Sequence, residues 1–354
     1  MATVYVALRD RLLRAEGDEE WTTTTALEGH DLECLAASPD TPERVFVGTF
    51  ESGLHRSTDG GDSFDSLETG FVPERESGYG GAENLESDAE NLESDAVTAV
   101  TISPHDPDVV YAGTEPSRVY RSTDGGDSWT HLEGLTDLPS AGSWFFPPRP
   151  HTHHVRWLEV DPFNPDRLYV GIEAGAFVLS TDGGESWQER PEGSRRDNHS
   201  MATHPDQEGL VYSAAGDGFA VSTDGGESWD HPQEGLEHRY CWNVVPDPGD
   251  PESVLVSSAS GARSAHTASS AESYVYRSSG GEPWERLERT GLPTGEDVVR
   301  AEFAAGTEPG VVYAANNRGL FRTGDFGDSW DRLEVAWPES LEAQAPRGLA
   351  VLEE

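Results

Sequence analysis

Short runs in which apolar and polar residues alternate recur along the whole chain. Arg44–Phe50, Val109–Thr114, Arg167–Ile172 and Val311–Ala315 are examples. A period of two is typical of β-strands, because successive side chains on a strand point to opposite faces of the sheet. Turn residues separate the runs. The pattern predicts an all-β protein.

An eight-residue motif, here called the octet, follows these runs. Its closing aromatic residues recur at intervals from 42 residues (Trp187 to Trp229) to 65 residues (Phe64 to Trp129). A repeat of roughly 40 residues with insertions is the size of one four-stranded propeller blade. The six copies are Ser57–Phe64, Ser122–Trp129, Ser180–Trp187, Ser222–Trp229, Ser278–Trp284, which is one residue short, and Thr323–Trp330.

Each part of the octet has a mechanical role in a tight turn. An Asp can accept hydrogen bonds from the amides that follow it, and the glycines permit positive φ. The aromatic residue then buries a large surface between neighbouring sheets. Calcium loops are also acidic and rich in glycine, but they need more oxygen ligands than this turn supplies, and Ser279 replaces the Asp in the fifth copy. We therefore interpret these acids as turn residues: Asp59, Asp124, Asp182, Asp224 and Asp325.

The octet resembles the Asp-box, Ser-x-Asp-x-Gly-x-x-Trp, of the bacterial neuraminidase repeat family. The resemblance implies a β-propeller like those of sialidases, sortilin-like receptors and WD40/YVTN-like proteins. It points toward glycoside chemistry, since sialidases and some xyloglucan-acting hydrolases carry Asp-boxes. Photosystem II assembly factors and sortilin-type receptors share the motif without being enzymes. The typical Arg-Ile-Pro motif of sialidases is absent here, and sialidase rings have six blades, so the resemblance covers the fold far better than an active site.

We predict a seven-bladed β-propeller that forms a single domain over residues 1–354. The N-terminal strands lack an inner strand, and the C-terminal segment supplies one, so that pairing of the two ends closes the ring and removes both sheet edges. The predicted blades are 29–69, 95–134, 153–191, 196–232, 239–289, 297–334, and 347–354 together with 2–27.

The charge of the chain limits the environments and partners that we expect for it. The net charge is −42, with 66 acidic residues and 24 basic residues, all of them arginine. So acidic a chain is not suited to nucleic acid, because phosphate binding needs basic clusters. It resembles proteins of salt-loving archaea, in which molar salt screens self-repulsion to about 3 Å. We expect low salt to loosen the ring, and a melting temperature that is indifferent to salt would contradict this.

The sequence also predicts where the protein works. The N-terminus has no charged-then-apolar leader and no run reaches the roughly 18 apolar residues of a membrane span, so we expect a cytoplasmic monomer without a membrane partner. Cys34 and Cys241 are expected to be small buried apolar residues rather than a disulfide.

Three insertions depart from the repeat, at Phe71–Ser94, Leu135–Thr152 and Gly261–Ser273. The first contains ENLESDA twice, at Glu83–Ala89 and Glu90–Ala96, and we interpret it as a mobile acidic loop. Connections of these kinds leave a propeller on the face opposite the octet turns. Because insertions carry function more often than the scaffold does, we expect the ligand there.

One position of the inner strands carries a different residue in each blade. Glu33, Thr98, Arg156, His199, Trp242, Arg300 and Arg347 occupy it in order. A scaffold position would repeat similar apolar residues, so we place a site at the mouth of the central channel. The candidate catalytic residues are Glu115, Glu173, Asp217 and His199. The candidate ligand-binding residues are Arg156, His153, His154, Arg239, Trp242, His266, Arg300 and Arg347.

Two functions from different classes fit this mouth. One is the binding of a small, anionic molecule by arginines, with hydrolysis of glycoside type, for which a retaining enzyme needs two carboxylates about 5 Å apart. Histidine with Glu or Asp can serve as acid and base or hold a divalent metal; no residue is assigned as a metal ligand, and the cofactor is left open. The alternative is a non-enzymatic interaction or assembly scaffold, with contact anchors at Trp144, Phe145, Phe146, Tyr240 and Trp242.

Overall fold

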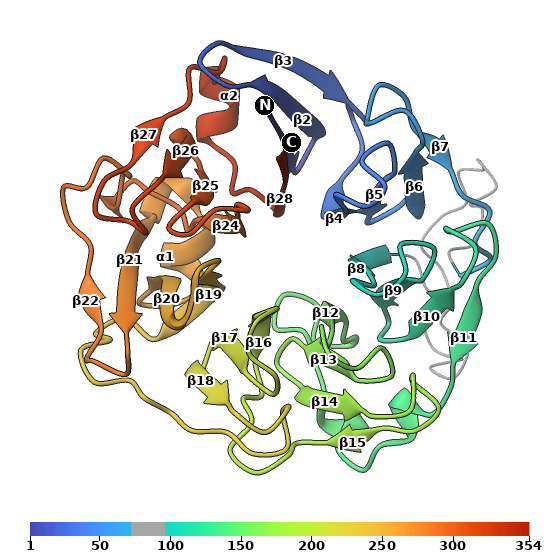
Figure 1. The fold of residues 1–354 in the computed structure, drawn as a ribbon. Helices are drawn as coiled ribbons and strands as arrows, with labels where there is room; N and C mark the ends of the chain where they lie inside the picture. Colours follow the sequence, from blue (N-terminus) through green and yellow to red (C-terminus); the bar gives the residue numbers. More distant parts are fainter. Residues whose placement is uncertain (72–95, 354) are drawn as a thin grey trace.

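The computed structural model describes residues 1–71 and 96–353. In it seven antiparallel sheets are arranged as a ring around a common axis (Figure 1). The predicted all-β, seven-bladed propeller is thereby confirmed. Each sheet is formed by consecutive strands, except where the two ends of the chain meet.

The strands, given from the axis outward, define the blades. Blades one to three are β4 (Leu32–Ala37), β5 (Val45–Thr49), β6 (Leu54–Ser57), β7 (Asp65–Ser66); β8 (Ala96–Ile102), β9 (Val110–Glu115), β10 (Val119–Ser122), β11 (Thr130–Leu132); and β12 (Val155–Val160), β13 (Leu168–Ile172), β14 (Ala176–Ser180), β15 (Gln188–Glu189). Blades four and five are β16 (Asn198–Thr203), β17 (Val211–Ala215), β18 (Gly218–Ser222); and β19 (Tyr240–Asp247), β20 (Asp250–Ala259), β21 (Glu272–Ser279), β22 (Glu285–Arg286). Blades six and seven are β24 (Glu302–Ala305), β25 (Val312–Asn316), β26 (Gly319–Thr323), β27 (Asp331–Arg332); and β28 (Gly348–Glu353), β1 (Ala2–Leu8), β2 (Arg11–Gly17), β3 (Trp21–Ala26).

The two ends of the chain close the ring. Strand β28 pairs antiparallel with β1, in a register that runs from Ala2 opposite Glu353 to Ala7 opposite Gly348. The termini accordingly lie side by side (Figure 1). The predicted closure by the C-terminal strand is confirmed.

Blades four and five depart from the four-stranded plan. In blade four the residues after the octet form only an isolated bridge between Val221 and Asp230, and Pro232 follows two residues later. Proline has no N–H to continue a ladder, which explains why the outer strand ends there. In blade five the additional strand β23 (Gly295–Glu296) pairs with β21.

The octets form tight turns on one face of the ring. In the third copy, Asp182 accepts hydrogen bonds from the Ser186 amide at 2.9 Å and the Ser180 hydroxyl at 2.9 Å, while the Gly184 amide donates to Ser180 at 2.9 Å. The same bonds recur at Asp59, Asp124, Asp224 and Asp325. The predicted role of the Asp as a turn residue is confirmed.

Residues of the octets also contact the neighbouring blades. Trp229 is buried and meets Phe177 of blade three edge to face, with ring centroids 4.9 Å apart. Arg56 of blade one donates to the Gly125 carbonyl and the Asp127 carboxylate of the next octet, both at 2.7 Å. The apolar cores lie between adjacent sheets, so each octet stabilises an interface between blades.

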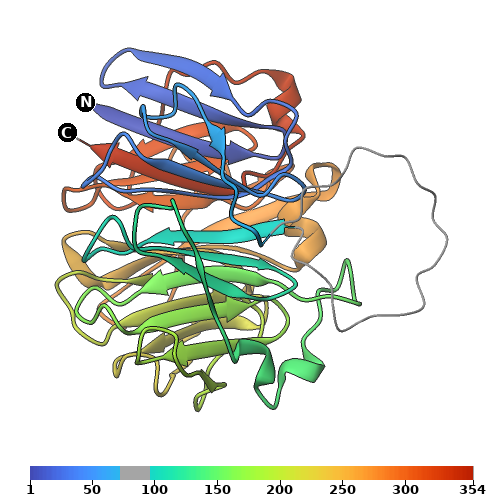
Figure 2. The same cartoon turned by 90° about the vertical axis from the view of Figure 1, so that its right-hand side faces the viewer.

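The insertions lie on the opposite face. Two of them contain short helices: η1 (Leu135–Asp137), η2 (Ala141–Ser143), α1 (Ala262–His266) and η3 (Ala268–Ser270). In Figure 2 the green helical turns near residue 140 and the orange α1 lie on the same side of the ring, with the red α2 (Glu339–Glu342). Most of the first insertion, with its duplicated heptapeptide, lies outside the described residues.

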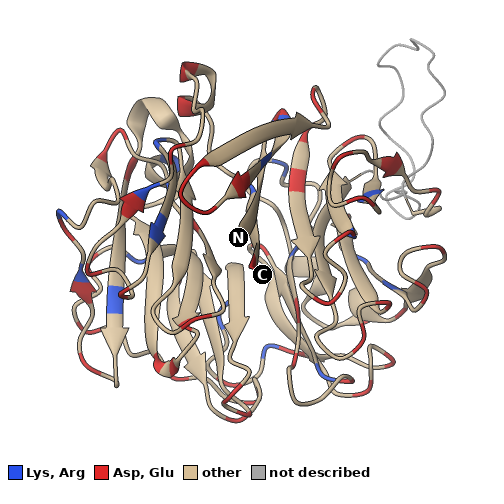
Figure 3. Ribbon diagram, turned by 45° about the horizontal axis from the view of Figure 1, so that its top comes forward, with Lys and Arg blue, Asp and Glu red and all other residues tan. Residues whose placement is uncertain are grey.

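Acidic residues are spread along the chain, with arginines scattered among them (Figure 3). Cys34 and Cys241 are both buried and free, as expected. Within residues 1–71 and 96–353, no helix has both the length and the apolar character that crossing a lipid bilayer requires.

Candidate ligand site at the channel mouth

β-Bulges point the variable residues of the inner strands toward the axis. In each of blades one to five, one residue near the start of the inner strand is skipped by the ladder of paired residues. A bulge leaves its extra residue unpaired and re-aims its side chain. The skipped residues are Glu33, Thr98, Arg156, His199 and Trp242. Arg300 and Arg347 occupy the corresponding place just before β24 and β28.

Six of these seven residues, all except His199, line a cavity of about 720 Å³ at the channel mouth, the end of the channel where the inner strands begin. The octets hydrogen-bond to the turns at the other end of these strands, as Gly183 does to the Asp166 carbonyl at 2.8 Å. The mouth therefore lies opposite the octets. The predicted site residues that line it are His154, Arg156, Glu173, Trp242, His266, Arg300 and Arg347.

Two arginines lie against one indole ring at the mouth, and a third, Arg347, lines the same cavity. The guanidinium carbons of Arg300 and Arg156 lie 4.0 Å and 4.7 Å from the centroid of the Trp242 ring. Arg347 donates to Glu33 at 3.0 Å. Arg156 also lines a second cavity, of about 420 Å³, which extends along the inner strands. It therefore lies where the two spaces meet.

The buried Glu302 carboxylate contacts both Arg300 and Trp242. Glu302 accepts hydrogen bonds from Arg300 and from the Trp242 indole, both at 2.8 Å. Nε of the same guanidinium donates to His266 Nδ1 at 3.0 Å. His266 Nε2 therefore carries the proton and donates to the Tyr240 hydroxyl at 3.2 Å. Because the Tyr240 hydroxyl accepts this hydrogen bond, its own proton points in another direction. Tyr240 also lines the cavity.

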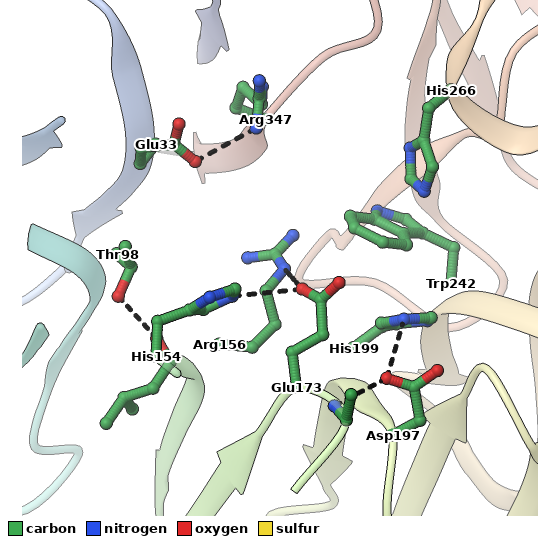
Figure 4. A network of polar contacts seen from close by, with 12 residues as sticks. Glu33, Thr98, His154, Arg156, Glu173, Asp197, His199, Trp242, His266 and Arg347 are labelled. Atoms are coloured by element: carbon green, nitrogen blue, oxygen red, sulfur yellow. Dashed lines mark hydrogen bonds and ion pairs between the residues drawn. The ribbon is translucent and has the colours of Figure 1, made fainter. Parts of the chain in front are cut away.

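Two carboxylates and a histidine form a second group at the mouth, here called the carboxylate–histidine group: Glu173, Asp197 and His199 (Figure 4). One ligand atom from each lies within 4.8 Å of the others. His154 Nε2 donates to Glu173 at 3.1 Å, and the Ala174 amide donates to Asp197 at 2.8 Å.

The surroundings move the pKa values of the two carboxyls in opposite directions. Burial by itself raises the pKa of Glu173, but the hydrogen bond from His154 and the nearby His199 and Arg156 outweigh it, so the pKa lies well below its usual value. Burial also raises the pKa of Asp197; His199 opposes this and the Glu173 charge adds to it, and the net change is upward. Burial and the adjacent Arg300 lower the pKa of His266 to about 2, which fits the neutral ring deduced above.

Five predicted site residues do not line the cavity. His199 is buried beside it, against the rings of Tyr240 and Trp242. Glu115 is buried and is held by both ends of the Arg149 guanidinium, so its charge is already paired. Asp217 is exposed in the turn between β17 and β18. Arg239 is exposed and donates to the Leu236 carbonyl. His153 packs against the edge of a tryptophan ring, and its Nδ1 accepts from the Ser117 amide.

The structure places two acids in the site that sequence reasoning did not select. Asp197 joins the carboxylate–histidine group, and Glu302 orients Arg300 and Trp242. Among 66 acids neither stands out. The one available signal was the spacing of Asp197 and His199, because residues two apart on a strand share a face.

The proposed aromatic contact anchors Trp144 and Phe145 differ in exposure. Phe145 is 44% exposed, whereas Trp144 is 5% exposed and donates its indole N–H to Ser140 at 2.8 Å. Trp144 is part of the core between blades two and three and cannot serve as a contact anchor.

No protein-family model matches the chain. An oligoxyloglucan reducing-end-specific xyloglucanase of Emericella nidulans is 23% identical over 167 residues, which are 45% of this chain and 18% of that protein. A xyloglucanase of Acetivibrio thermocellus is 26% identical over 184 residues, 46% of this chain and 20% of that protein. The chain thus spans about a fifth of the length of the curated relatives it matches.

Solved structures with the same fold come from enzymes and from a protein-binding propeller. The GH74 xyloglucanase of Xanthomonas campestris aligns over 99% of this chain and 52% of its own, with 17% identity and a TM-score of 0.64. The GH74 enzyme of Niastella koreensis aligns over 97% and 52%, with 16% identity and a TM-score of 0.64. YCF48 bound to a D1 peptide aligns over 92% and 94%, with 14% identity and a TM-score of 0.58. At these identities the likeness shows the fold alone.

Proposed function

We propose that this propeller binds a small anionic molecule at the channel mouth and hydrolyses it, with a glycoside as the substrate class. The proposal combines two properties of the mouth. Its arginines supply an anion-binding wall, and its carboxylate–histidine group supplies reactive side chains. The relatives named above direct the choice of glycosides as the first substrates to test.

The environment of Arg156 is the main observation in favour of an anionic ligand. The residue is only 9% exposed, and its guanidinium lies 4.7 Å from the centroid of the Trp242 ring without a hydrogen bond to any described residue. The carboxylate oxygen paired with it, on Glu173, is 4.0 Å from Nε. A guanidinium presents five donors in a planar fork that matches a carboxylate or a phosphate. Arg156 therefore has the donors to bind such a group at the mouth.

Glu173 is the candidate for the reacting side chain. Of the three predicted catalytic acids, it alone lines the cavity, and its low pKa keeps it ionised. Its partner in the site is Asp197 rather than Glu115 or Asp217. The spacing within the carboxylate–histidine group, at most 4.8 Å, is close to the roughly 5 Å that brings two carboxylates to one glycosidic bond.

Binding tests the proposal directly. Oligosaccharides that contain uronic acid are titrated and followed by tryptophan fluorescence, since Trp242 lies against Arg156. We expect saturable binding that Arg156→Gln weakens about 10- to 100-fold, the range for charge-assisted hydrogen bonds. Arg277→Gln, which removes an arginine that contacts an octet, is the matched control and should bind as the wild type does. Failure of every anionic sugar to bind, or wild-type affinity of Arg156→Gln, contradicts the proposal.

A protein-binding scaffold is the second candidate function. Phe145 and Phe163 are large apolar side chains that are 44% and 43% exposed, and YCF48 shows that a propeller of this fold can bind a peptide. Phe145→Ala then reduces partner binding and leaves sugar binding unchanged. The opposite result favours the small-molecule site.

A further inference from the structure

We propose that Glu173, Asp197 and His199 form a binding site for a divalent transition-metal ion, zinc or manganese. The site rests on the proposed function in one respect, because the ion would lie beside Arg156 and contact the same anionic ligand. Metal binding itself is separate from that function and can be measured without any ligand.

The tautomer of His199 is fixed by its surroundings. Its Nδ1 lies 2.7 Å from the Cys241 carbonyl oxygen, which can only accept a hydrogen bond. Nδ1 therefore carries a proton, and Nε2 is the nitrogen that can offer a lone pair to a metal ion when the ring is neutral. A metal-binding histidine commonly has this arrangement, with its other N–H donated to a carbonyl or a carboxylate.

Nε2 of His199 is buried beside the two carboxylates. His199 is 1% exposed, and its Nε2 has no hydrogen-bond partner in the described part of the chain. The carboxylate oxygen of Asp197 lies 3.7 Å from it, too far for a hydrogen bond. A buried polar atom without a partner costs free energy, and a cation between His199 and the acids would satisfy it.

The three donor atoms are close enough to share one ion after a small adjustment. They lie within 4.8 Å of one another, and two ligands of a single ion at about 2.0–2.2 Å are at most about 4.3 Å apart. Asp197 and His199 already lie 3.7 Å apart, so the separation that must shorten is the one to Glu173. The group is otherwise held in place, Glu173 by His154 and Asp197 by the Ala174 amide.

The donor types select the kind of ion. Calcium and magnesium prefer oxygen ligands alone, whereas an imidazole nitrogen with carboxylates suits zinc or manganese. The local charge also favours a cation, since two carboxylates face one imidazole and Arg156 remains 4.0 Å from Glu173. A bound ion with an open position would attract an anionic ligand together with Arg156, and such an ion can activate water for hydrolysis.

Calorimetric titration of the metal-free protein with zinc or manganese chloride tests this site. The 66 acids of the chain bind cations weakly, so the titration is done at high salt, which screens exposed charges. We expect one saturable site per chain. Asp197→Asn and His199→Gln should each weaken it at least about 10- to 100-fold. Asp31→Asn is the matched control, because Asp31 lines the same cavity outside the group.

The absence of a saturable site, or retention of wild-type affinity by both Asp197→Asn and His199→Gln, overturns the inference and leaves adventitious surface binding only. If His199→Gln does not fold, the proton NMR spectrum of the wild-type cobalt(II) protein is used instead, because a bound imidazole gives a paramagnetically shifted N–H resonance. The absence of that resonance likewise overturns the inference. Sugar binding in the presence of EDTA separates the two proposals. If it persists and is still weakened by Arg156→Gln, a failed metal titration removes the metal site and not the ligand site.

Discussion

The two faces of the ring use equivalent positions of the blades in opposite ways. On the octet face, Asp182 and its counterparts accept the same hydrogen bonds in five blades. At the mouth, the bulge position carries Glu, Thr, Arg, His and Trp in successive blades. A residue that repeats in every blade serves a structural requirement common to all blades. Residues that differ at equivalent positions serve a requirement that arises only once in the ring. The octet face is scaffold, and the mouth is where we place function.

The largest expected effect is on the mouth. Glu173→Gln should lower hydrolysis of an anionic glycoside by about 10³-fold or more, which corresponds to roughly 4 kcal/mol of transition-state stabilisation. The melting temperature should fall as well, because the interactions that lower the pKa of Glu173 also stabilise the folded state, so turnover is compared at a temperature where both proteins are folded. Comparison of turnover with thermal unfolding checks both statements. Equal turnover in the two proteins would remove Glu173 from the mechanism.

The matching change on the octet face should act on stability alone. Trp229 is 7% exposed and packs against Phe177, so Trp229→Ala should lower the free energy of unfolding by about 3–5 kcal/mol. Urea titration followed by circular dichroism measures the loss. At temperatures where the variant is folded, anion binding at the mouth should be unchanged. A selective loss of binding would mean that the two faces are coupled.

Glu159, on the channel wall between the two faces, should show a pH trend of its own. Burial raises the pKa of Glu159 to about 7, and hydrogen bonds from Thr203 and Trp157 only partly oppose this. Between its ordinary pKa of 4.5 and about 7 the folded state keeps a proton that the unfolded state releases, so Glu159 makes folding less favourable as the pH rises through this window.

Glu159→Gln should therefore match the wild type in stability near pH 4 and exceed it by on the order of 2 kcal/mol near pH 8. Urea unfolding at the two pH values provides the measurement. A constant difference between the two proteins would show that the carboxyl is not protonated in the folded state at neutral pH.

The smallest expected effect concerns the octet carboxylates, whose pKa values move the other way. Hydrogen bonds from Ser186, first by its hydroxyl and then by its amide, lower the pKa of Asp182, so its contribution is present above an ordinary Asp pKa of about 4 and lost as the pH falls below it. Asp182→Ala should cost about 1 kcal/mol near neutral pH. Glu185→Ala, an exposed acid in the same turn, should change stability by less than about 0.5 kcal/mol. If both substitutions have the same effect, the turn hydrogen bonds contribute little.

The fold could be predicted in detail because its signals are local. Octets mark each blade, and the incomplete N-terminal unit together with the C-terminal apolar segment predicts closure. The shortened outer strand of blade four was missed although Pro232 signals it. Alignment of the inner strands identified the position that the bulges turn toward the axis, since a bulge at a fixed distance from a turn keeps its place in each repeat.

The composition of the site was less predictable, because pairing in space decides it. Glu115 and Glu173 occupy similar places at the ends of β9 and β13, yet Arg149 from an insertion holds one and the other faces the cavity. Asp197 is one acid among many in the sequence and becomes distinctive only beside His199 and Glu173. Such contacts depend on the packing of loops that carry no repeat.

The most direct test of this account compares one residue from each face in a single assay. Calorimetric titration of the wild type, Arg156→Gln and Asp182→Ala with an anionic oligosaccharide separates the mouth from the scaffold. The account predicts one binding site, weakened about 10- to 100-fold by Arg156→Gln and unchanged by Asp182→Ala. Equal binding by wild type and Arg156→Gln, or a loss confined to Asp182→Ala, would contradict the assignment of function to the mouth.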